Sequence, residues 1–173
     1  MNRLLAAIVV SLSMLPATSI WAAFTPAPVK PAEEVDADFT AAIQARNDMD
    51  WEVMIGSLNK VILRKPANDD AHALLGYGHR KLGDFEKALF HYHLSLNLNP
   101  NNRDALNYLG IAYLHMEQIE LADATLEKLN AVCQAPAEGT TTSECKQRDD
   151  LASDIAFFRE NGYVEERCPD DWH

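Results

Sequence analysis

Positive charge is scarce in this chain of 173 residues, and the scarcity narrows the range of partners. Lys and Arg together number 15, against 26 Asp and Glu, so the formal net charge is −11. A chain of this charge repels phosphate backbones and acidic lipid surfaces. We therefore expect no binding to nucleic acid.

A long apolar run is also missing. The run Leu4–Leu15 is twelve residues, and a helix that spans a membrane needs about 20. It follows a positively charged start at Arg3 and precedes small residues at Ala22 and Ala23, which is typical of a secretory signal. We expect residues 1–22 to be a signal peptide and the chain to be exported, with a periplasmic location and no further membrane span. An uncleaved anchor is the alternative.

Recognisable catalytic arrangements are lacking as well. No Ser/His/Asp constellation, no pair of carboxylates on a defined scaffold and no phosphate-binding glycine loop can be placed in the sequence. His72 and His79 are two helical turns apart, a rise of roughly 10.5 Å, which is too far for one metal ion. We interpret them as packing residues. The sequence predicts a protein that is not an enzyme and that uses no cofactor.

Cysteine is rare, and none of the three cysteines lies in a CxxC motif. This excludes the signatures of thioredoxin-type exchange and of c-type haem attachment. In an exported chain the spacing of Cys133 and Cys145 predicts a disulfide. Cys168 remains as a free thiol or as a link to another chain. A thiol- or metal-handling tail that uses Cys168 and His173, and self-association of the chain, are therefore the alternative functions.

What the sequence does contain is a period of 34 residues. A shift by 34 places Leu75-Gly76 on Leu109-Gly110 and Ala88 on Ala122. The same shift places Asp50-Trp51-Glu52 on Asp84-Phe85-Glu86. So many coincidences at one offset indicate an internal repeat.

The repeated pattern is a Leu-Gly pair, an aromatic residue, a Gly-Asp-Phe turn, then Ala, Tyr and Pro, and it resembles the tetratricopeptide repeat. Unit 69–102 fits at nearly every position; unit 103–134 lacks the turn glycine, and unit 35–68 matches only in its second half. The positions that carry the resemblance are Pro66, Leu75, Gly76, Gly83, Ala88, Tyr92, Pro100, Leu109, Gly110, Tyr113 and Ala122.

The resemblance implies an all-α solenoid of three helix pairs with a short right-handed superhelical path. Residues 23–34 are rich in proline and read as an extended leader. Beyond the repeats we expect a loop at 135–143, a capping helix at 144–162 that begins near Ser143, and an acidic tail at 163–173. Leu151, Ile155 and Phe158 form the apolar stripe of that helix.

The glycines of the repeat have structural explanations. Gly76 and Gly110 are expected where the two helices of a unit cross closely, and Gly83 is expected to end a helix in the left-handed conformation. Gly78 has no role that the repeat predicts.

In the family that the sequence resembles, the first helix of each unit lines a concave groove that binds peptides. The 34-residue alignment assigns to this groove Phe39, Ile43, Arg46, Asn47, Tyr77, Arg80, Lys81, Asn107, Ile111, Leu114 and His115. Ala73 and an acidic rim of Asp36, Asp70 and Asp104 accompany them. An apolar strip beside cations suggests a partner protein or peptide with a carboxylate near an apolar anchor. Coverage of the groove by the leader or by a second chain is the alternative.

Overall fold

The computed structural model describes residues 36–134 and 145–165. The predicted signal peptide and leader, the loop 135–143 and the end of the tail, including Cys168 and His173, lie outside the described residues. Within them the chain is all-α. The helices are α1 (Ala37–Asn47), α2 (Trp51–Arg64), α3 (Asp69–Lys81), α4 (Phe85–Leu98), α5 (Arg103–His115), α6 (Ile119–Gln134) and α7 (Lys146–Asn161).

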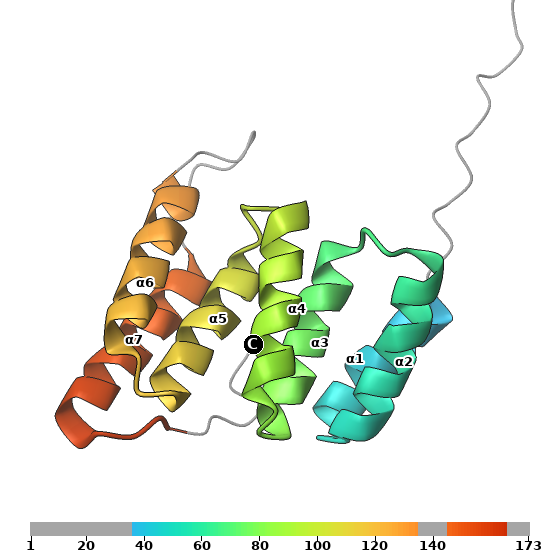
Figure 1. Cartoon of the computed structure of the whole chain (residues 1–173), viewed down its shortest axis with the longest axis horizontal. Coiled ribbons are helices and arrows are strands. Elements are labelled where there is room, and N and C mark those ends of the chain that lie inside the picture. Colours follow the sequence, from blue (N-terminus) through green and yellow to red (C-terminus); the bar gives the residue numbers. More distant parts are fainter. Residues whose placement is uncertain (1–35, 135–144, 166–173) are drawn as a thin grey trace, which may run out of the picture. The chain divides into compact units, whose positions relative to one another are not determined.

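Helices α1 to α6 form three pairs, and each pair lies within one of the 34-residue units. Successive helices pack side by side along the row, and the first helices of neighbouring pairs, α3 and α5, also contact each other (Figure 1). Four of these helices have N-cap side chains at positions that recur with the repeat. Asn68 and Asn102 cap α3 and α5, and Asp50 and Asp84 cap α2 and α4, each by accepting a backbone N–H.

The turn inside each pair needs one residue in the left-handed conformation. That residue is Met49 (φ 58°), Gly83 (φ 77°) or Glu117 (φ 58°), and the three positions are spaced by the repeat period. The prediction for Gly83 is confirmed. The third unit uses the same backbone turn although its glycine is replaced by Glu117.

The close approach predicted at Gly76 is confirmed, because a Cβ atom there would lie 2.5 Å from the ring of Tyr92 on α4. The prediction for Gly110 is wrong about the neighbour. A Cβ atom at Gly110 would lie 2.5 Å from Leu151 of α7 rather than against α6. The structure explains why Gly78 is a glycine, because a Cβ atom there would lie 2.9 Å from Ile55 of α2. Each of these three glycines lies at a close contact between two helices.

Helix α7 covers the last pair. Leu151 and Ile155 are buried, and Phe158 packs against the same cluster, which also contains Leu114 and Leu129 of α5 and α6. The predicted disulfide joins Cys133 at the end of α6 to Cys145, whose Cα atoms are 5.9 Å apart.

The start of α7 differs from the expectation. Its N-cap is Cys145, whose side chain makes no capping hydrogen bond, and the predicted cap Ser143 lies outside the described residues. The predicted stop is confirmed, because Gly162 ends the helix at φ 77°.

Candidate functional site

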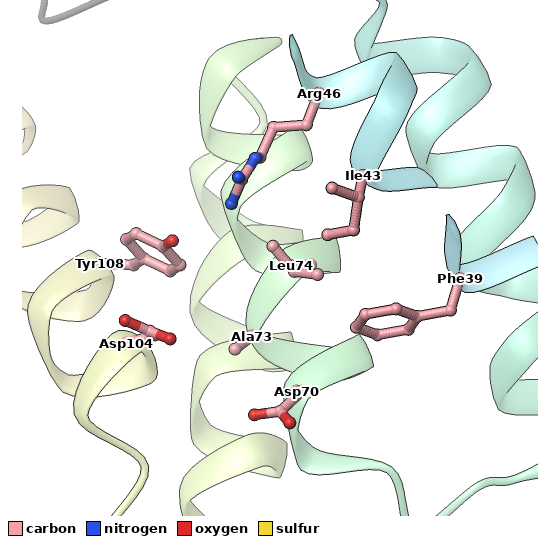
Figure 2. Close-up of a pocket in the computed structure, with 8 residues that line it drawn as sticks. All are labelled: Phe39, Ile43, Arg46, Asp70, Ala73, Leu74, Asp104 and Tyr108. Carbon is pink, nitrogen blue, oxygen red and sulfur yellow. The ribbon is translucent and has the colours of Figure 1, made fainter. Parts of the chain in front are cut away.

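A pocket of about 230 Å³ opens between α1, α3 and α5. It crosses three successive first helices, so residues far apart in the sequence meet in it (Figure 2). The side chains that line it are Phe39, Ile43, Arg46, Asp70, Ala73, Leu74, Asp104 and Tyr108.

The helical spacing explains the contribution of α1. Phe39, Ile43 and Arg46 are separated by four and three residues, so they share one face of the helix. All three are half-buried. In Figure 2 the guanidinium of Arg46 reaches over the pocket from one end, and Phe39 and Ile43 form a wall. The sequence prediction for these three residues agrees with the pocket lining.

The two carboxylates of the pocket come from equivalent positions. Asp70 and Asp104 lie in the first turns of α3 and α5, one repeat period apart. Figure 2 shows both at the end of the pocket opposite the Cα of Arg46. Asp70 accepts a hydrogen bond of 2.9 Å from Asn102 Nδ2, and Asp104 accepts one of 2.9 Å from Gln147 Nε2. Neither makes an ion pair within the described residues.

The two carboxylates at this end of the pocket repel each other. Burial raises the pKa of Asp70, and the negative charges of Asp69 and Asp104 raise it further, whereas the hydrogen bond from Asn102 opposes them. The acidic rim predicted at Asp36 is different. Asp36 forms ion pairs with Arg64 at 2.8 Å and with Lys65 at 3.6 Å, so its charge is balanced within the chain.

Two residues predicted for the groove, Tyr77 and Arg80, are instead buried between α3 and α5. Their exposed fractions are 3% and 8%. The ring of Tyr77 lies 5.1 Å from that of Tyr108, and Arg80 Nη1 lies 3.1 Å from Nε2 of His115. The prediction was wrong for these two because their face of α3 packs against the next first helix.

The corresponding residues of the third pair are buried in the same way, under α7. Asn107 and Leu114 have no exposed surface and Ile111 has 7%. Asn107 Nδ2 donates to the backbone carbonyl of Gln147 at 2.8 Å. With α7 in place, these side chains are not available to a partner.

The other predicted groove residues lie outside the pocket lining. Asn47 is exposed, and the Lys81 ammonium sits 5.7 Å from the ring centre of Trp51. Sequence reasoning missed Leu74 and Tyr108 as lining residues. Their signal was present, because they are apolar residues at equivalent positions of consecutive units, each four residues after a pocket carboxylate.

A second cluster of polar side chains lies on α3 and α4, outside the pocket. His72 Nε2 bonds to the carbonyl of Pro66 at 3.1 Å, so that nitrogen carries the hydrogen. Its Nδ1 is then the acceptor of the 3.2 Å contact with His91 Nδ1. Burial, with the nearby His72 and His79, lowers the pKa of His91 to about 4. The packing interpretation of His72 agrees with its burial, at 4% exposed.

Within residues 36–134 and 145–165, no group of three His, Cys, Asp or Glu side chains is arranged to hold a metal ion. Among the helices of this part of the chain, none combines the length and the apolar character that a membrane span requires.

Comparison with protein families identifies the second unit. Residues 69–102 match the model of the tetratricopeptide repeat, over the same range that the period predicts. No curated protein matches the sequence significantly.

Solved structures share the fold of the described helices. The TPR2B domain of yeast Sti1, in complex with pHsp70, matches with a TM-score of 0.60 and 16% identity, over 69% of this chain and 94% of that one. The Sgt2 TPR domain from Aspergillus fumigatus matches with a TM-score of 0.58 and 18% identity, over 82% and 92%. A point mutant of MamA matches with a TM-score of 0.52 and 22% identity, over 59% and 74%.

Proposed function

We propose that this chain is an exported interaction module without chemistry of its own. It contains a tetratricopeptide repeat at residues 69–102 and has the fold of tetratricopeptide-repeat domains. It binds a segment of a partner protein in the pocket between α1, α3 and α5. The observation that carries this proposal is the pocket itself, where an apolar wall and charged groups from three repeats converge.

The composition of the pocket fits a peptide-binding surface. Phe39 and Ile43 give apolar contact area, while Arg46, Asp70 and Asp104 give directional polar contacts. Of the solved structures with this fold, the TPR2B domain of Sti1 is a complex with pHsp70, so the same architecture accommodates another protein there.

Two observations support export. The N-terminal sequence reads as a secretory signal, and the disulfide Cys133–Cys145 is typical of an oxidising compartment such as the periplasm. Cell fractionation together with N-terminal sequencing of the isolated protein tests this part. A mature chain that begins near Ala23 in the envelope fraction is expected, and a cytoplasmic chain that retains Met1 would contradict it.

The binding function is tested by a pull-down from an envelope extract with three baits. They are the unmodified protein, the pocket variant Ile43→Arg and the control Leu63→Arg. Ile43 is half-buried in the pocket wall, whereas Leu63 on α2 is 82% exposed and does not line the pocket. Both variants introduce the same side chain, so they share any nonspecific effect of the added charge.

A partner captured by the unmodified protein and by Leu63→Arg, and lost with Ile43→Arg, is the expected result. Circular dichroism establishes that both variants are folded. Equal capture by all three baits would place the binding surface elsewhere. Substitution of Tyr77 or Arg80 would not serve this purpose, because both are buried and neither lines the pocket.

A further inference from the structure

We propose that the pocket accepts a lysine or arginine side chain from an extended segment of the partner protein. The positively charged head of that side chain lies between Asp70 and Asp104, and its aliphatic stem lies along Phe39, Ile43 and Leu74. The inference rests on the proposed function and specifies its partner. It reverses the expectation from the sequence, which was a partner with a carboxylate.

The charges of the pocket favour a cationic side chain. The pocket contains two carboxylates and one guanidinium, and the carboxylates at its acidic end receive hydrogen bonds only from neutral amides, those of Asn102 and Gln147, among the described residues. They also repel each other, since the charge of Asp104 raises the pKa of Asp70. A positive charge placed between them removes this repulsion and gains two charge-assisted hydrogen bonds. A carboxylate in the same place would add to the repulsion.

The apolar lining of the pocket fits the stem of such a side chain. The apolar wall and floor lie between the acidic end and Arg46, as Figure 2 shows. Lysine and arginine bury their methylene stems along apolar surface while the charged head reaches a polar group. Leu74, which is 7% exposed, and the half-buried Phe39 both line the pocket and give such a stem apolar contact. The cavity of about 230 Å³ has room for one side chain of this length.

Arg46 lies where it can contact the backbone of the bound segment. Its guanidinium makes no ion pair within the described part of the chain, and it stands across the pocket from Asp70 (Figure 2). From there it can donate hydrogen bonds to backbone carbonyls of the bound segment. The negative charge of the whole chain, −11, favours encounter with a basic partner over an acidic one.

The test uses labelled peptides of about ten residues, a length suited to an extended segment in a groove. One peptide has Val-Lys-Leu at its centre, a second replaces the lysine by norleucine, and a third replaces it by glutamate. Fluorescence anisotropy measures their binding to the full-length protein and to two variants. The pocket variant is Asp70→Asn with Asp104→Asn. The matched control is Glu52→Gln with Glu86→Gln, two exposed acids outside the pocket that are also one repeat period apart.

We expect the lysine peptide to bind at least about tenfold more tightly than the norleucine peptide, and the glutamate peptide to bind most weakly. The preference should shrink with added salt. It should disappear in the pocket variant, which retains the weaker binding of the norleucine peptide, and should persist in the control.

The contrary outcomes separate the two proposals. Pocket-dependent binding in which norleucine or glutamate equals lysine would overturn this inference and leave the proposed function standing. Binding of no peptide would count against both. The leader of this chain itself contains Val29-Lys30, so the variant Lys30→Ala is included. If that substitution strengthens peptide binding, the occupant is the chain's own leader, which would overturn the assignment to a partner protein.

Discussion

Helix α5 covers the second repeat and helix α7 covers the third, yet the two junctions differ in their chemistry. The junction of α3 with α5 contains Tyr77, Arg80 and His115. Among the described residues the Nε of Arg80 is buried there without a hydrogen-bond partner, and so is the Oδ1 of Asn107 at the junction of α5 with α7. The junction of α5 with α7 contains the aliphatic residues Leu114 and Leu151, and the disulfide holds it in place.

Side chains at equivalent positions of the repeat therefore contribute differently to the stability of the two junctions. Arg80 and Leu114 are one repeat period apart, and only the second contributes a full apolar side chain to the core. Each junction carries the desolvation penalty of one such buried polar atom. The C-terminal junction adds aliphatic contacts and a disulfide, so the junction beside the pocket is the less costly one to open. The junction of α5 with α7 is therefore expected to be the more stable of the two.

Truncation at the two equivalent positions should have unequal costs. Leu114→Ala creates a cavity at a site with no exposed surface and should lower the free energy of unfolding by about 2–5 kcal/mol. Arg80→Met removes a buried cation that no carboxylate of the described residues pairs with and should change it by less than about 1 kcal/mol. Urea denaturation measures both. Equal losses would remove the energetic distinction between the junctions.

Loss of the disulfide should weaken the C-terminal junction selectively. Replacement of Cys133 and Cys145 by alanine opens a loop with a sequence separation of 12 and should cost about 3 kcal/mol by the chain-entropy account. Hydrogen exchange should increase in α7 and α6 and change little in α1 to α4. Uniform loss of protection over all helices would show that the solenoid unfolds as one unit.

A double-mutant cycle tests the contact between Gly110 and Leu151. Gly110→Ala should cost about 1–3 kcal/mol because its Cβ would overlap Leu151. In the background of Leu151→Ala most of that cost should vanish, with a coupling energy of about 1–2 kcal/mol. Gly76→Ala is the control. Its clash is with Tyr92, so its cost should be the same in both backgrounds.

Acid should weaken the second repeat through His91. The pKa of this residue falls from an ordinary value of about 6.5 to about 4 on folding, so the unfolded chain binds more protons in that interval. The stabilisation is complete above pH 6.5 and is lost as the pH falls towards 4. Allowing for the partial exposure of the ring, the loss should be about 1–2 kcal/mol. His91→Phe should flatten this part of the pH profile, whereas His93→Phe, at an exposed site on the same helix, should leave it unchanged.

Glycine at the strained turns should raise the stability of the fold. Met49 and Glu117 adopt the left-handed conformation, which strains a side chain that has a Cβ. Glu117→Gly and Met49→Gly should each raise the free energy of unfolding by about 0.5–1 kcal/mol after the extra entropy of the unfolded chain is counted. Gly83→Ala, at the equivalent turn, should lower it by a similar amount. A thermal melting series measures all three, and a loss at Glu117 would mean that its side chain makes a compensating contact.

The helix pairs were predictable because the period, the capping Asn and Asp residues and the turn at Gly83 are local signals. The pocket was predictable in part. The alignment assigned Phe39, Ile43 and Arg46 to the groove, and they line the pocket because α1 packs less closely on α3 than α3 does on α5.

The remaining groove residues could not be placed because a period aligns positions and does not show what lies over them. Tyr77 and Ile111 are equivalent to Ile43, but α5 and α7 bury them. The neighbour of Gly110 was missed for the same reason. The contact of His72 with His91 joins two helices across a separation of 19 residues, for which the sequence has no periodic signal.

Helix α7 also limits how the array of repeats can grow. It packs against α5 and α6 in the way that α5 packs against α3 and α4, so it stands where the first helix of a fourth repeat would begin. Its exposed residues include Ala152, Ser153, Ala156 and Arg159, which are small or charged and offer little apolar surface for another copy. Duplication of a repeat would therefore have to insert upstream of α7, since these helix residues would give a further repeat little apolar area to pack on.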